Sequence, residues 1–416
     1  MYFNPLWNGY SFDDSYILQD NKQIQQGISA IPEIFTSYYH QEKGDTFGYR
    51  PVVRSLYAIE WSLFGNHPGA FHLLSILYFC LLCFLIFQFL KSLFPELNQT
   101  LVVYIVLLFA THPIHTEVVA SLKNREEIIA MILGIVSLIL FLKYIDSKKW
   151  YYLPAIIFVL FIAVLTKENA LTYPLLFPFI YFIKKPLPDF NVRHFYKPIL
   201  LFVLFFIPAW LAWKMPDLIL ENAQKDLFFF ENPLHFNHSF TDKIFMAGTS
   251  LWFYIKILVI PYPLRFYYGF NMFPETTFSY VLAITFIFVS LGLFVLALRQ
   301  MQQKKPLGFF ILFFFISISV FTNYFIPVNG IVGERLAFQA SLGYCGAFTL
   351  LLFNYFDRKN KSKSLKIPTG FKSIMVMIII IFSLMVIQRN KAWKSYESLL
   401  KADIEKLDAS AKGQVV

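Results

Sequence analysis

Two adjacent carboxylates, Asp13 and Asp14, stand near the start of the chain in the segment SFDDSYIL. Neighbouring negative charges repel each other, so a fold keeps them together where water, a cation or a reaction uses them. The ordinary interpretation of such a pair is a solvated turn or a helix cap. The alternative is that one of the two accepts a proton as a general base.

Further clusters of ionisable residues interrupt otherwise apolar stretches. They lie in the segments THPIHTEVVASLKNREEIIA, LTKENALTYP and IPVNGIVGERLAFQASLGY, and in the N-terminal region up to the segment NHPGAFHL. Polar side chains within or at the ends of membrane spans are costly, so they often mark functional sites. The residues concerned are His112, His115, Glu117, Arg125, Glu126, Glu127, Lys167, Glu168, Glu334, Arg335, Arg50, Arg54, His67 and His72.

The composition indicates a protein that is solvated by lipid. Of its 416 residues, 57% are hydrophobic and 19% aromatic, whereas only 15% are charged. A soluble domain carries about 25% charged residues. Uninterrupted apolar runs such as SYVLAITFIFVSLGLFVLAL reach the roughly 20 residues that a bilayer-crossing helix needs. The sequence therefore predicts an all-α polytopic membrane protein.

Lysine and arginine concentrate in short loops between the apolar runs. The loops KYIDSKKW, KKPLPDFNVRHFYK, RQMQQKK and DRKNKSKSLK carry this excess, and such loops remain on the cytoplasmic side of a membrane. The placement explains the formal net charge of +10 as a topology signal, so no nucleic-acid partner is predicted.

These anchors predict an outer segment at residues 1–68, a transmembrane domain at 69–388 and an outer helical tail at 389–416. The stretch 243–260 is expected to be re-entrant or interfacial, within an outer segment of about 215–276, because a crossing would place two basic loops outside. Both chain ends then lie outside, so we expect a first span to be missing. The ten predicted spans are roughly 69–91, 99–112, 125–143, 151–166, 168–184, 198–214, 277–298, 307–325, 336–355 and 373–388.

This topology brings every ionisable cluster to one face of the membrane. For a single member, a snorkelling charge or a structural ion pair is the ordinary interpretation. Clusters that mix carboxylates and cations and converge on one surface favour a site, and they favour chemistry over capping for Asp13 and Asp14.

The spacing of His112 and His115, with Glu117 nearby, also resembles a divalent metal site. Pro113 disfavours a helix at the preceding residue, so the two histidines lack the helical spacing that zinc sites use. Zinc is therefore not favoured. A hard cation held loosely by carboxylates remains an alternative, and no cofactor is assigned firmly.

The same blocks resemble the transmembrane O-mannosyltransferases that carry tetratricopeptide repeats, a family of the GT-C glycosyltransferase superfamily. The resemblance rests first on DDSYI, YRPVVRSLYAIEWSLFGNHPGAFHLLSILYF and HPIHTEVVASLKNREEIIA. LTKENALTYP, ENPL and PVNGIVGERLAFQASLGY follow in the same order, and RNKAWKSYESLLKADIEKLDASAK is similar to the junction where the repeats begin. It covers nearly the whole chain.

The resemblance implies an integral membrane enzyme whose site faces the lumen or periplasm. Such an enzyme transfers a sugar, typically mannose, from a polyprenyl phosphate donor to a protein hydroxyl and inverts the anomeric centre. An acidic residue of the first outer loop would be the general base, and the matching motif holds Asp13 and Asp14. The first span and the repeats of the family are absent from this sequence, which leaves the choice of acceptor open.

The residue types suit this chemistry. A serine or threonine hydroxyl is a poor nucleophile, and a positioned carboxylate that takes its proton is worth about 10²–10⁴-fold in rate. Cations near the membrane surface can stabilise the charge that grows on the departing phosphate. The candidates for this role are Arg50, Arg125, Lys167 and Arg335, with His112, His115, Glu117, Glu168 and Glu334 as supporting residues.

Other functions stay open at this stage. The same donor chemistry could serve a glycolipid or polysaccharide acceptor, and a lipid-linked sugar transporter or flippase could use the same donor. Transporters place their site near the bilayer midplane on broken helices within inverted repeats, and no internal repeat is visible in the sequence. The expected partners are the polyprenyl phosphate sugar, a protein acceptor and the lipid bilayer.

Overall fold

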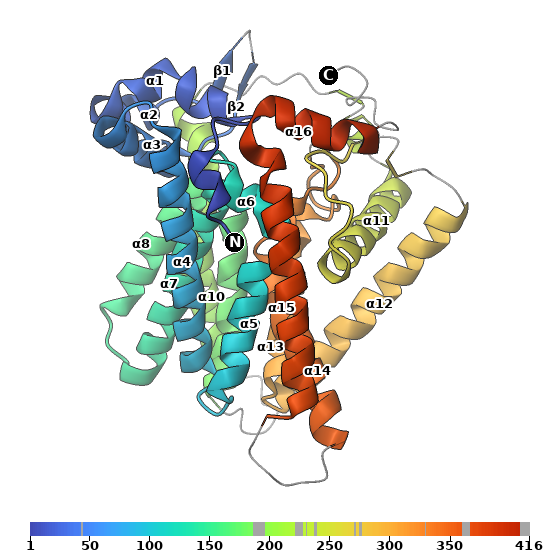
Figure 1. Cartoon of the computed structure of the whole chain (residues 1–416). Helices are drawn as coiled ribbons and strands as arrows, with labels where there is room; N and C mark the ends of the chain where they lie inside the picture. Colours follow the sequence, from blue (N-terminus) through green and yellow to red (C-terminus); the bar gives the residue numbers. More distant parts are fainter. Residues whose placement is uncertain are drawn as a thin grey trace.

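The computed structural model is a bundle of long helices with short elements gathered at one end (Figure 1). The N-terminal segment, residues 1–64, and the last helix, α16 (Tyr396–Asp403), lie at this end, which we call the capped end. The structure describes residues 1–42, 45–185, 196–220, 228–229, 231–236, 239–269, 272–273, 277–328, 330–359 and 367–407. Parts of the predicted outer segment 215–276, of the tail 389–416 and of two basic loops therefore lie outside the described residues.

Short helices and one pair of strands make up the N-terminal segment. The two strands pair antiparallel, with His40 opposite Phe47, and are a small exception to the predicted all-α fold. Pro51 occupies the first turn of the longest helix of this segment, where its missing N–H leaves no hydrogen bond unmade. The elements are η1 (Asn4–Trp7), η2 (Ser15–Gln19), α1 (Lys22–Gln25), η3 (Gly27–Ala30), α2 (Ile31–Ile34), β1 (His40–Glu42), β2 (Asp45–Phe47) and α3 (Pro51–Phe64).

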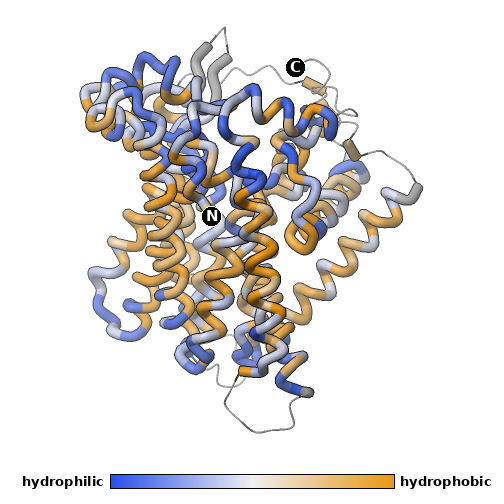
Figure 2. Tube along the Cα trace, in the orientation of Figure 1, coloured by the Kyte–Doolittle hydropathy of each residue, from blue (hydrophilic) through white to orange (hydrophobic). Residues whose placement is uncertain are grey.

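Long apolar helices form the body of the bundle, and hydrophilic residues gather towards its two ends (Figure 2). The helices of the bundle are α4 (Pro68–Leu93), α5 (Gln99–Thr111), α7 (Arg125–Ser147), α8 (Tyr152–Thr166), α9 (Phe177–Lys184), α10 (Tyr196–Ile219), α12 (Thr277–Gln302), α13 (Pro306–Ile318), α14 (Ala340–Lys359) and α15 (Thr369–Asn390). The shorter elements between them are η4 (Pro113–His115), α6 (Thr116–Ala120), η5 (Glu168–Leu176), η7 (Pro233–His235), α11 (Phe240–Val259), η8 (Ser319–Phe321), η9 (Glu334–Ala337), η10 (Ala392–Lys394) and η11 (Ile404–Lys406).

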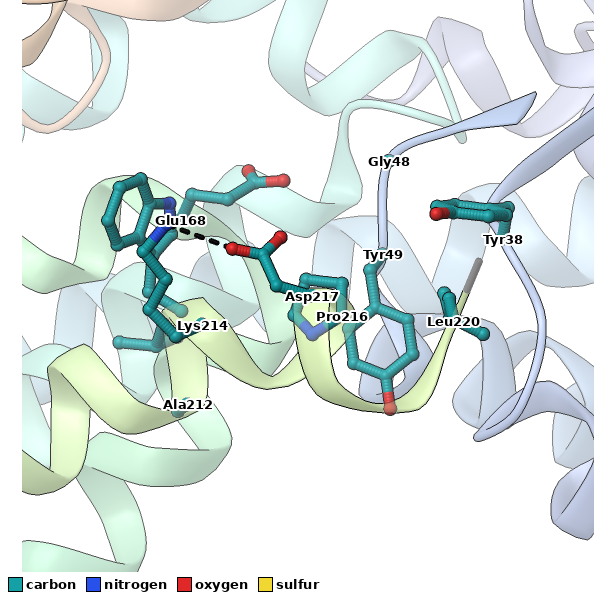
Figure 3. A pocket seen from close by; sticks show the side chains of 11 residues that line it. Tyr38, Gly48, Tyr49, Glu168, Ala212, Lys214, Pro216, Asp217 and Leu220 are labelled. Atoms are coloured by element: carbon teal, nitrogen blue, oxygen red, sulfur yellow. Dashed lines mark hydrogen bonds and ion pairs between the residues drawn. The ribbon is translucent and has the colours of Figure 1, made fainter. Parts of the chain in front are cut away.

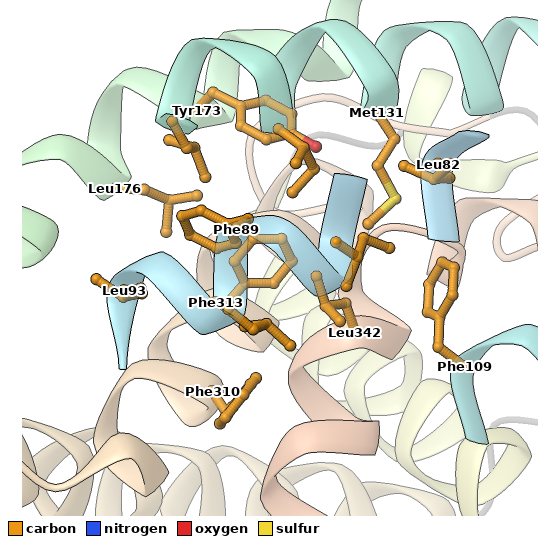
Figure 4. Packing of buried hydrophobic residues seen from close by; sticks show 14 of the residues in the cluster. Leu82, Phe89, Leu93, Phe109, Met131, Tyr173, Leu176, Phe310, Phe313 and Leu342 are labelled. Atoms are coloured by element: carbon orange, nitrogen blue, oxygen red, sulfur yellow. The ribbon is translucent and has the colours of Figure 1, made fainter. Parts of the chain in front are cut away.

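One apolar core runs through the centre of the bundle. Phe89 of α4, Met131 of α7, Phe313 of α13 and Leu342 of α14 are fully buried in it (Figure 4). Side chains from helices distant in sequence interdigitate there, as they do in the interiors of soluble proteins. The core therefore holds these helices in fixed relative positions.

Five described helices are long and apolar enough to cross a membrane, or six if the bent pair Gln99–Thr111 and Pro113–Ala120 counts as one span. These observations confirm the class of helical membrane protein. Several of the other predicted spans correspond to shorter apolar helices, such as Tyr152–Thr166 and Pro306–Phe321. The predicted span 168–184 is divided into the 3₁₀ helix η5 and the α-helix α9.

Helix α11, in the stretch expected to be re-entrant or interfacial, packs beside α12. The ring of Phe245 packs against that of Tyr280 with centroids 4.3 Å apart, and the ring of Trp252 packs against that of Phe286 at 4.9 Å. The contacts advance in the same direction along both helices, so the two helices are parallel. Because the two helices are parallel, α11 and α12 begin on the same side of the bundle. The chain is therefore back on its starting side when α12 begins.

Candidate active site

A break after α5 turns the chain across the capped end of the bundle. The chain bends by 51° between α5 and the following short helices, because Pro113 disfavours a helical conformation at His112. Helix α6 then ends at Ala120, and α7 begins at Arg125 with Glu126 and Glu127 in its first turn. Carboxylates are favourable there because the helix dipole places positive charge at the N-terminus.

Asp14 joins the first loop to the segment between α6 and α7. One carboxylate oxygen accepts hydrogen bonds from the backbone nitrogen (3.2 Å) and hydroxyl (3.1 Å) of Ser11. The other accepts from the Ser121 hydroxyl (3.0 Å) and the backbone nitrogen of Lys123 (2.9 Å). The side chain is buried, and burial raises its pKa to about 6 against the lowering effect of these bonds. Asp14 is thus fully occupied in holding the loop.

Asp13 has a different environment from its neighbour. Its side chain is only partly buried, and it forms no hydrogen bond or ion pair with the described part of the chain. Burial lowers the pKa of Arg335, but the negative charges of Glu117 and Asp13 raise it above its ordinary value. Asp13 is therefore a carboxylate without a fixed hydrogen-bond donor that lies near a cation.

Glu126 is the centre of the neighbouring ion-pair network. Its Oε1 atom lies 2.6 Å from Nη1 of Arg50, 2.7 Å from Nζ of Lys167 and 3.2 Å from Nζ of Lys123. Its other oxygen is buried and has no hydrogen-bond partner among the described residues. Three cations from three separate segments thus converge on one carboxylate at the start of α7.

Two neighbouring carboxylates share these cations. Lys167 also lies 2.8 Å from Glu127, and Arg50 lies 3.1 Å from Glu168. Arg50 thereby connects the first loop to the N-terminal ends of α7 and η5. The resulting network keeps its cations close together while leaving the side chains of Arg50 and Lys123 partly exposed, at 18% and 14%.

Arg335 extends the network towards Asp13. Its Nη1 atom lies 2.6 Å from Oε1 of Glu117, and its backbone nitrogen donates to the other Glu117 oxygen at 3.3 Å. The Arg335 side chain is 26% exposed, which leaves part of the guanidinium accessible. Glu117 therefore holds Arg335 in place through both carboxylate oxygens.

Lys123 belongs to this cluster and was not singled out from the sequence. Burial lowers its pKa, and the neighbouring cations Arg335, Lys167 and Arg50 lower it further against the opposing effect of Glu126. The only sequence signal is a lysine in the short connection between the histidine block and α7. Nothing local distinguishes it from an ordinary loop lysine, because its partners come from other segments.

Tyr39 is a second residue that the sequence did not reveal. Its ring lies under the Arg50 guanidinium, 5.4 Å from its central carbon, and its hydroxyl is buried without a hydrogen-bond partner among the described residues. Burial and the charges of Glu126 and Asp13 raise its pKa well above the ordinary value. A buried hydroxyl without a partner is costly, and such groups in native proteins often serve a ligand or a reaction.

Arg125, which the sequence predicted to bind phosphate, is enclosed inside the protein. Its guanidinium is fully buried, pairs with Glu60, and donates to the Ser75 hydroxyl at 2.9 Å and to the Phe71 carbonyl at 2.7 Å. The ring of Tyr57 lies 5.2 Å from its central carbon. Its donors are taken up inside the protein, so Arg125 connects α7 to α3 and α4 as a structural residue.

His112 and His115 also have partners inside the protein. Nε2 of His112 lies 2.9 Å from the Leu258 carbonyl of α11, and Nε2 of His115 lies 2.8 Å from the Ser341 hydroxyl of α14. Glu117 is paired with Arg335. The three side chains therefore do not converge as metal ligands. No group of three or more His, Cys, Asp or Glu suited to a metal occurs among the described residues.

Glu334 lies on the far side of the cluster and is buried. It accepts hydrogen bonds from the Tyr268 hydroxyl (2.7 Å) and the backbone nitrogen of Arg265. Burial raises its pKa to about 8, with a further contribution from Glu117 and opposition from Arg389 and these bonds. Glu334 thus holds the segment after α11 against η9.

A cavity of about 230 Å³ opens beside the Arg50–Glu168 pair (Figure 3). The first loop contributes Tyr38 and Tyr49 to its wall, and α10 contributes Lys214 and Asp217. The last two form an ion pair of 2.9 Å along α10. Glu168 lies at its edge, so the cavity adjoins the ion-pair network without containing Asp13.

Comparison with known proteins places this arrangement in a family context. Protein O-mannosyl-transferase TMTC1 of Homo sapiens is 24% identical in an alignment that covers 99% of this chain and 50% of the relative. The chain is a relative of the protein O-mannosyl-transferases. TMTC4 of Homo sapiens is 23% identical over 97% of this chain and 60% of its own length, and TMTC3 of Homo sapiens is 28% identical over 41% of this chain.

The similarity to the protein O-mannosyl-transferases confirms the resemblance seen in the sequence blocks. The chain spans about half the length of the curated relative TMTC1. No family model and no solved structure matches it.

Proposed function

We propose that the chain forms the membrane domain of a protein O-mannosyltransferase with the GT-C fold. It transfers mannose from a polyprenyl phosphate donor to a serine or threonine hydroxyl of a protein, with inversion at the anomeric carbon. In this proposal the bundle crosses the membrane about ten times, and the capped end faces the lumen or periplasm. The names of its relatives support the glycosyltransferase class.

The observation that carries the proposal is the difference between Asp13 and Asp14. Asp14 is buried and accepts four hydrogen bonds, whereas Asp13 is partly exposed and has no fixed donor in the described structure. A general base must reach the proton that it removes. Asp13 meets this requirement, and Asp14 keeps the Asp13 loop in place.

In the proposed reaction the acceptor oxygen attacks the anomeric carbon while its proton passes to Asp13. The bond from that carbon to the phosphate oxygen breaks, and its electron pair leaves with the lipid phosphate. The sugar becomes oxocarbenium-like at this point. Inversion requires the acceptor and the phosphate to lie on opposite faces of the sugar ring.

The cations of the network suit the departing phosphate. Arg50, Lys123 and Arg335 have partly exposed side chains, and Lys167 stands behind them on Glu126. Fixed charges aimed at developing negative charge are usually the largest contribution to catalysis. An arginine can bind two phosphate oxygens at once, while a lysine acts as a point charge.

Transfer of labelled mannose from a polyprenyl phosphate to a peptide tests the proposal directly. Membranes that contain the wild-type protein should label a serine- or threonine-containing peptide, and membranes with Asp13→Asn should not. Glu397→Gln is the matched control, because Glu397 is exposed and, within the described structure, forms an ion pair with Lys401 of the same helix and with no other residue. Labelling of a glycolipid but not of any peptide would show that the acceptor is a glycolipid and not a protein. Translocation of the lipid without sugar transfer would indicate a flippase.

A further inference from the structure

The C-terminal segment lies directly over the loop that carries Asp13. Arg389, at the end of α15, binds both oxygens of Asp403 at the end of α16, at 2.6 and 2.7 Å. Lys406 adds a contact of 3.0 Å, and the backbone nitrogen of Phe266 donates to the same carboxylate at 2.9 Å. The Arg389 and Asp403 side chains are only 8% and 0% exposed. Residues 389–407, which we call the clasp, are thereby folded back onto the bundle.

The clasp makes hydrogen bonds to the first residues of the chain. The Asn8 side chain donates to the Trp393 carbonyl at 3.1 Å, and the backbone nitrogen of Gly9 donates to the Lys394 carbonyl at 3.1 Å. The Trp393 side chain is 1% exposed. These contacts join residues separated by 385 positions, so they exist only when the clasp is folded.

Phe12, directly before Asp13, depends on the same contacts. It adopts a left-handed backbone conformation with φ +49°, which is unfavourable for a bulky residue and persists only where the surroundings hold it. Its ring packs against Phe266 at 5.2 Å and Tyr396 at 6.2 Å. The Asp403 carboxylate accepts a hydrogen bond from the backbone nitrogen of Phe266, and Tyr396 belongs to α16.

We propose that the clasp is a positioning element for the active site, and that the Arg389–Asp403 pair is the contact that closes it. Asp14 fixes the Asp13 loop from the side of α7, and the clasp fixes it through Phe12 from the side of α15. Arg389 and Asp403 act on transfer through the loop and do not touch the substrate. This inference rests on the proposed function, because it assumes that Asp13 accepts the proton.

Asp403→Asn tests the proposal, since it removes the charge while retaining the shape. The turnover number for transfer should fall by about 10- to 100-fold, because small displacements of a reacting group have effects of this size. The Michaelis constant for the donor should change by less than about twofold, because the cations of the network keep their partners. Hydrogen exchange of backbone amides in residues 8–14 should become faster.

Glu397→Gln is the control, because it breaks an exposed ion pair on the same helix, where both side chains are 76% exposed. It should leave both turnover and exchange unchanged. If Asp403→Asn does not fold, Tyr396→Ala provides the second variant, since this partly exposed ring contacts Phe12 and its loss leaves Asp403 intact. Tyr396→Ala should also lower turnover and accelerate exchange in residues 8–14.

Normal turnover and normal exchange in folded Asp403→Asn or Tyr396→Ala would overturn the positioning role. Faster exchange with unchanged turnover would also overturn it, because the loop would then be free to move without consequence. Absence of transfer by the wild-type protein would contradict the proposed function instead. The exchange measurement would still report whether the clasp holds the loop.

Discussion

The backbone nitrogen of Lys123 lies 2.9 Å from the Asp14 carboxylate. The side chain of the same lysine reaches Glu126, 3.2 Å away. One residue therefore connects the loop that carries Asp13 with the cations of the ion-pair network. The proposed transfer reaction requires a fixed separation between the Asp13 carboxylate and the cations that would receive the phosphate, and Lys123 connects the two.

The two neighbouring aspartates should respond differently to the same substitution. Asp13→Asn should reduce transfer by about 10²–10⁴-fold and change the free energy of unfolding by less than about 0.5 kcal/mol. Asp14→Asn should lower that free energy by about 1–3 kcal/mol. It replaces one carboxylate oxygen with an NH₂ group, so the N–H and O–H donors that bind this oxygen would lose their acceptor. Transfer rate and thermal unfolding, measured side by side, would decide. Equal losses of transfer at unchanged stability would contradict the assignment of separate roles.

Lys123→Met should weaken use of the donor. Glu126 keeps Arg50 and Lys167 as partners, so the substitution should not leave an unpaired buried charge. We expect kcat/KM for the donor to fall by about 10²-fold, because one electrostatic donor to a developing charge has about this effect. Lys401→Met, at an exposed position, serves as the control. A Lys123→Met protein with normal kinetics would remove this residue from the phosphate site.

Arg125→Met should act on stability and leave the chemistry of folded molecules unchanged. The substitution leaves the buried Glu60 carboxylate without its ion-pair partner. Removing one member of a buried ion pair lowers the free energy of unfolding by about 3–5 kcal/mol. The double variant with Glu60→Gln should recover part of this loss, because no unpaired charge remains. Thermal unfolding measures the effect. A stable Arg125→Met protein with a raised donor KM would restore the phosphate role predicted from the sequence.

Glu334 should make stability depend on pH. Burial raises its pKa from 4.5 to about 8 in the folded protein, so the native state holds the proton more tightly than the unfolded state. Stability is then lost as the pH rises from about 4.5 to about 8. Glu334→Gln retains an oxygen that can accept from Tyr268, and it should abolish this contribution. Unfolding midpoints of both proteins between pH 5 and 9 should diverge with rising pH, in favour of the variant; parallel curves would show that the carboxyl does not titrate there.

Tyr39→Phe should separate function from folding. Its hydroxyl has no partner among the described residues, so its loss should leave stability equal or slightly higher. Transfer should nevertheless fall, because we expect the hydroxyl to form a hydrogen bond with a ligand bound beside Arg50. Tyr49→Phe is the stability comparison, because the Tyr49 hydroxyl donates to the Phe35 carbonyl at 2.9 Å and its removal should cost about 1 kcal/mol. Wild-type transfer by Tyr39→Phe would exclude a role for its hydroxyl in the reaction.

The sequence alone determined the class of protein, and it predicted that the ionisable clusters gather on one face of the membrane. Apolar runs predict helices in lipid because every backbone group in a bilayer must find its partner within a helix or a closed barrel. The blocks around Asp13 and His112 were sufficient to indicate the family. The number of spans was harder, because helices such as Tyr152–Thr166 are shorter than the bilayer-crossing length.

Only the tertiary structure decided which residues could act. Asp13 and Asp14 are equivalent in sequence, and they differ because Ser121 and Lys123, more than 100 positions away, bind one of them. The positions of Arg125 and Lys123 have the same cause. Glu60 and Ser75 enclose Arg125, which the sequence predicted to bind phosphate, whereas Lys123, which the sequence did not single out, lies beside Glu126 and its cations. Hydropathy and spacing report a residue's local preference, whereas its hydrogen-bond partners are set by packing between segments that are far apart in the chain.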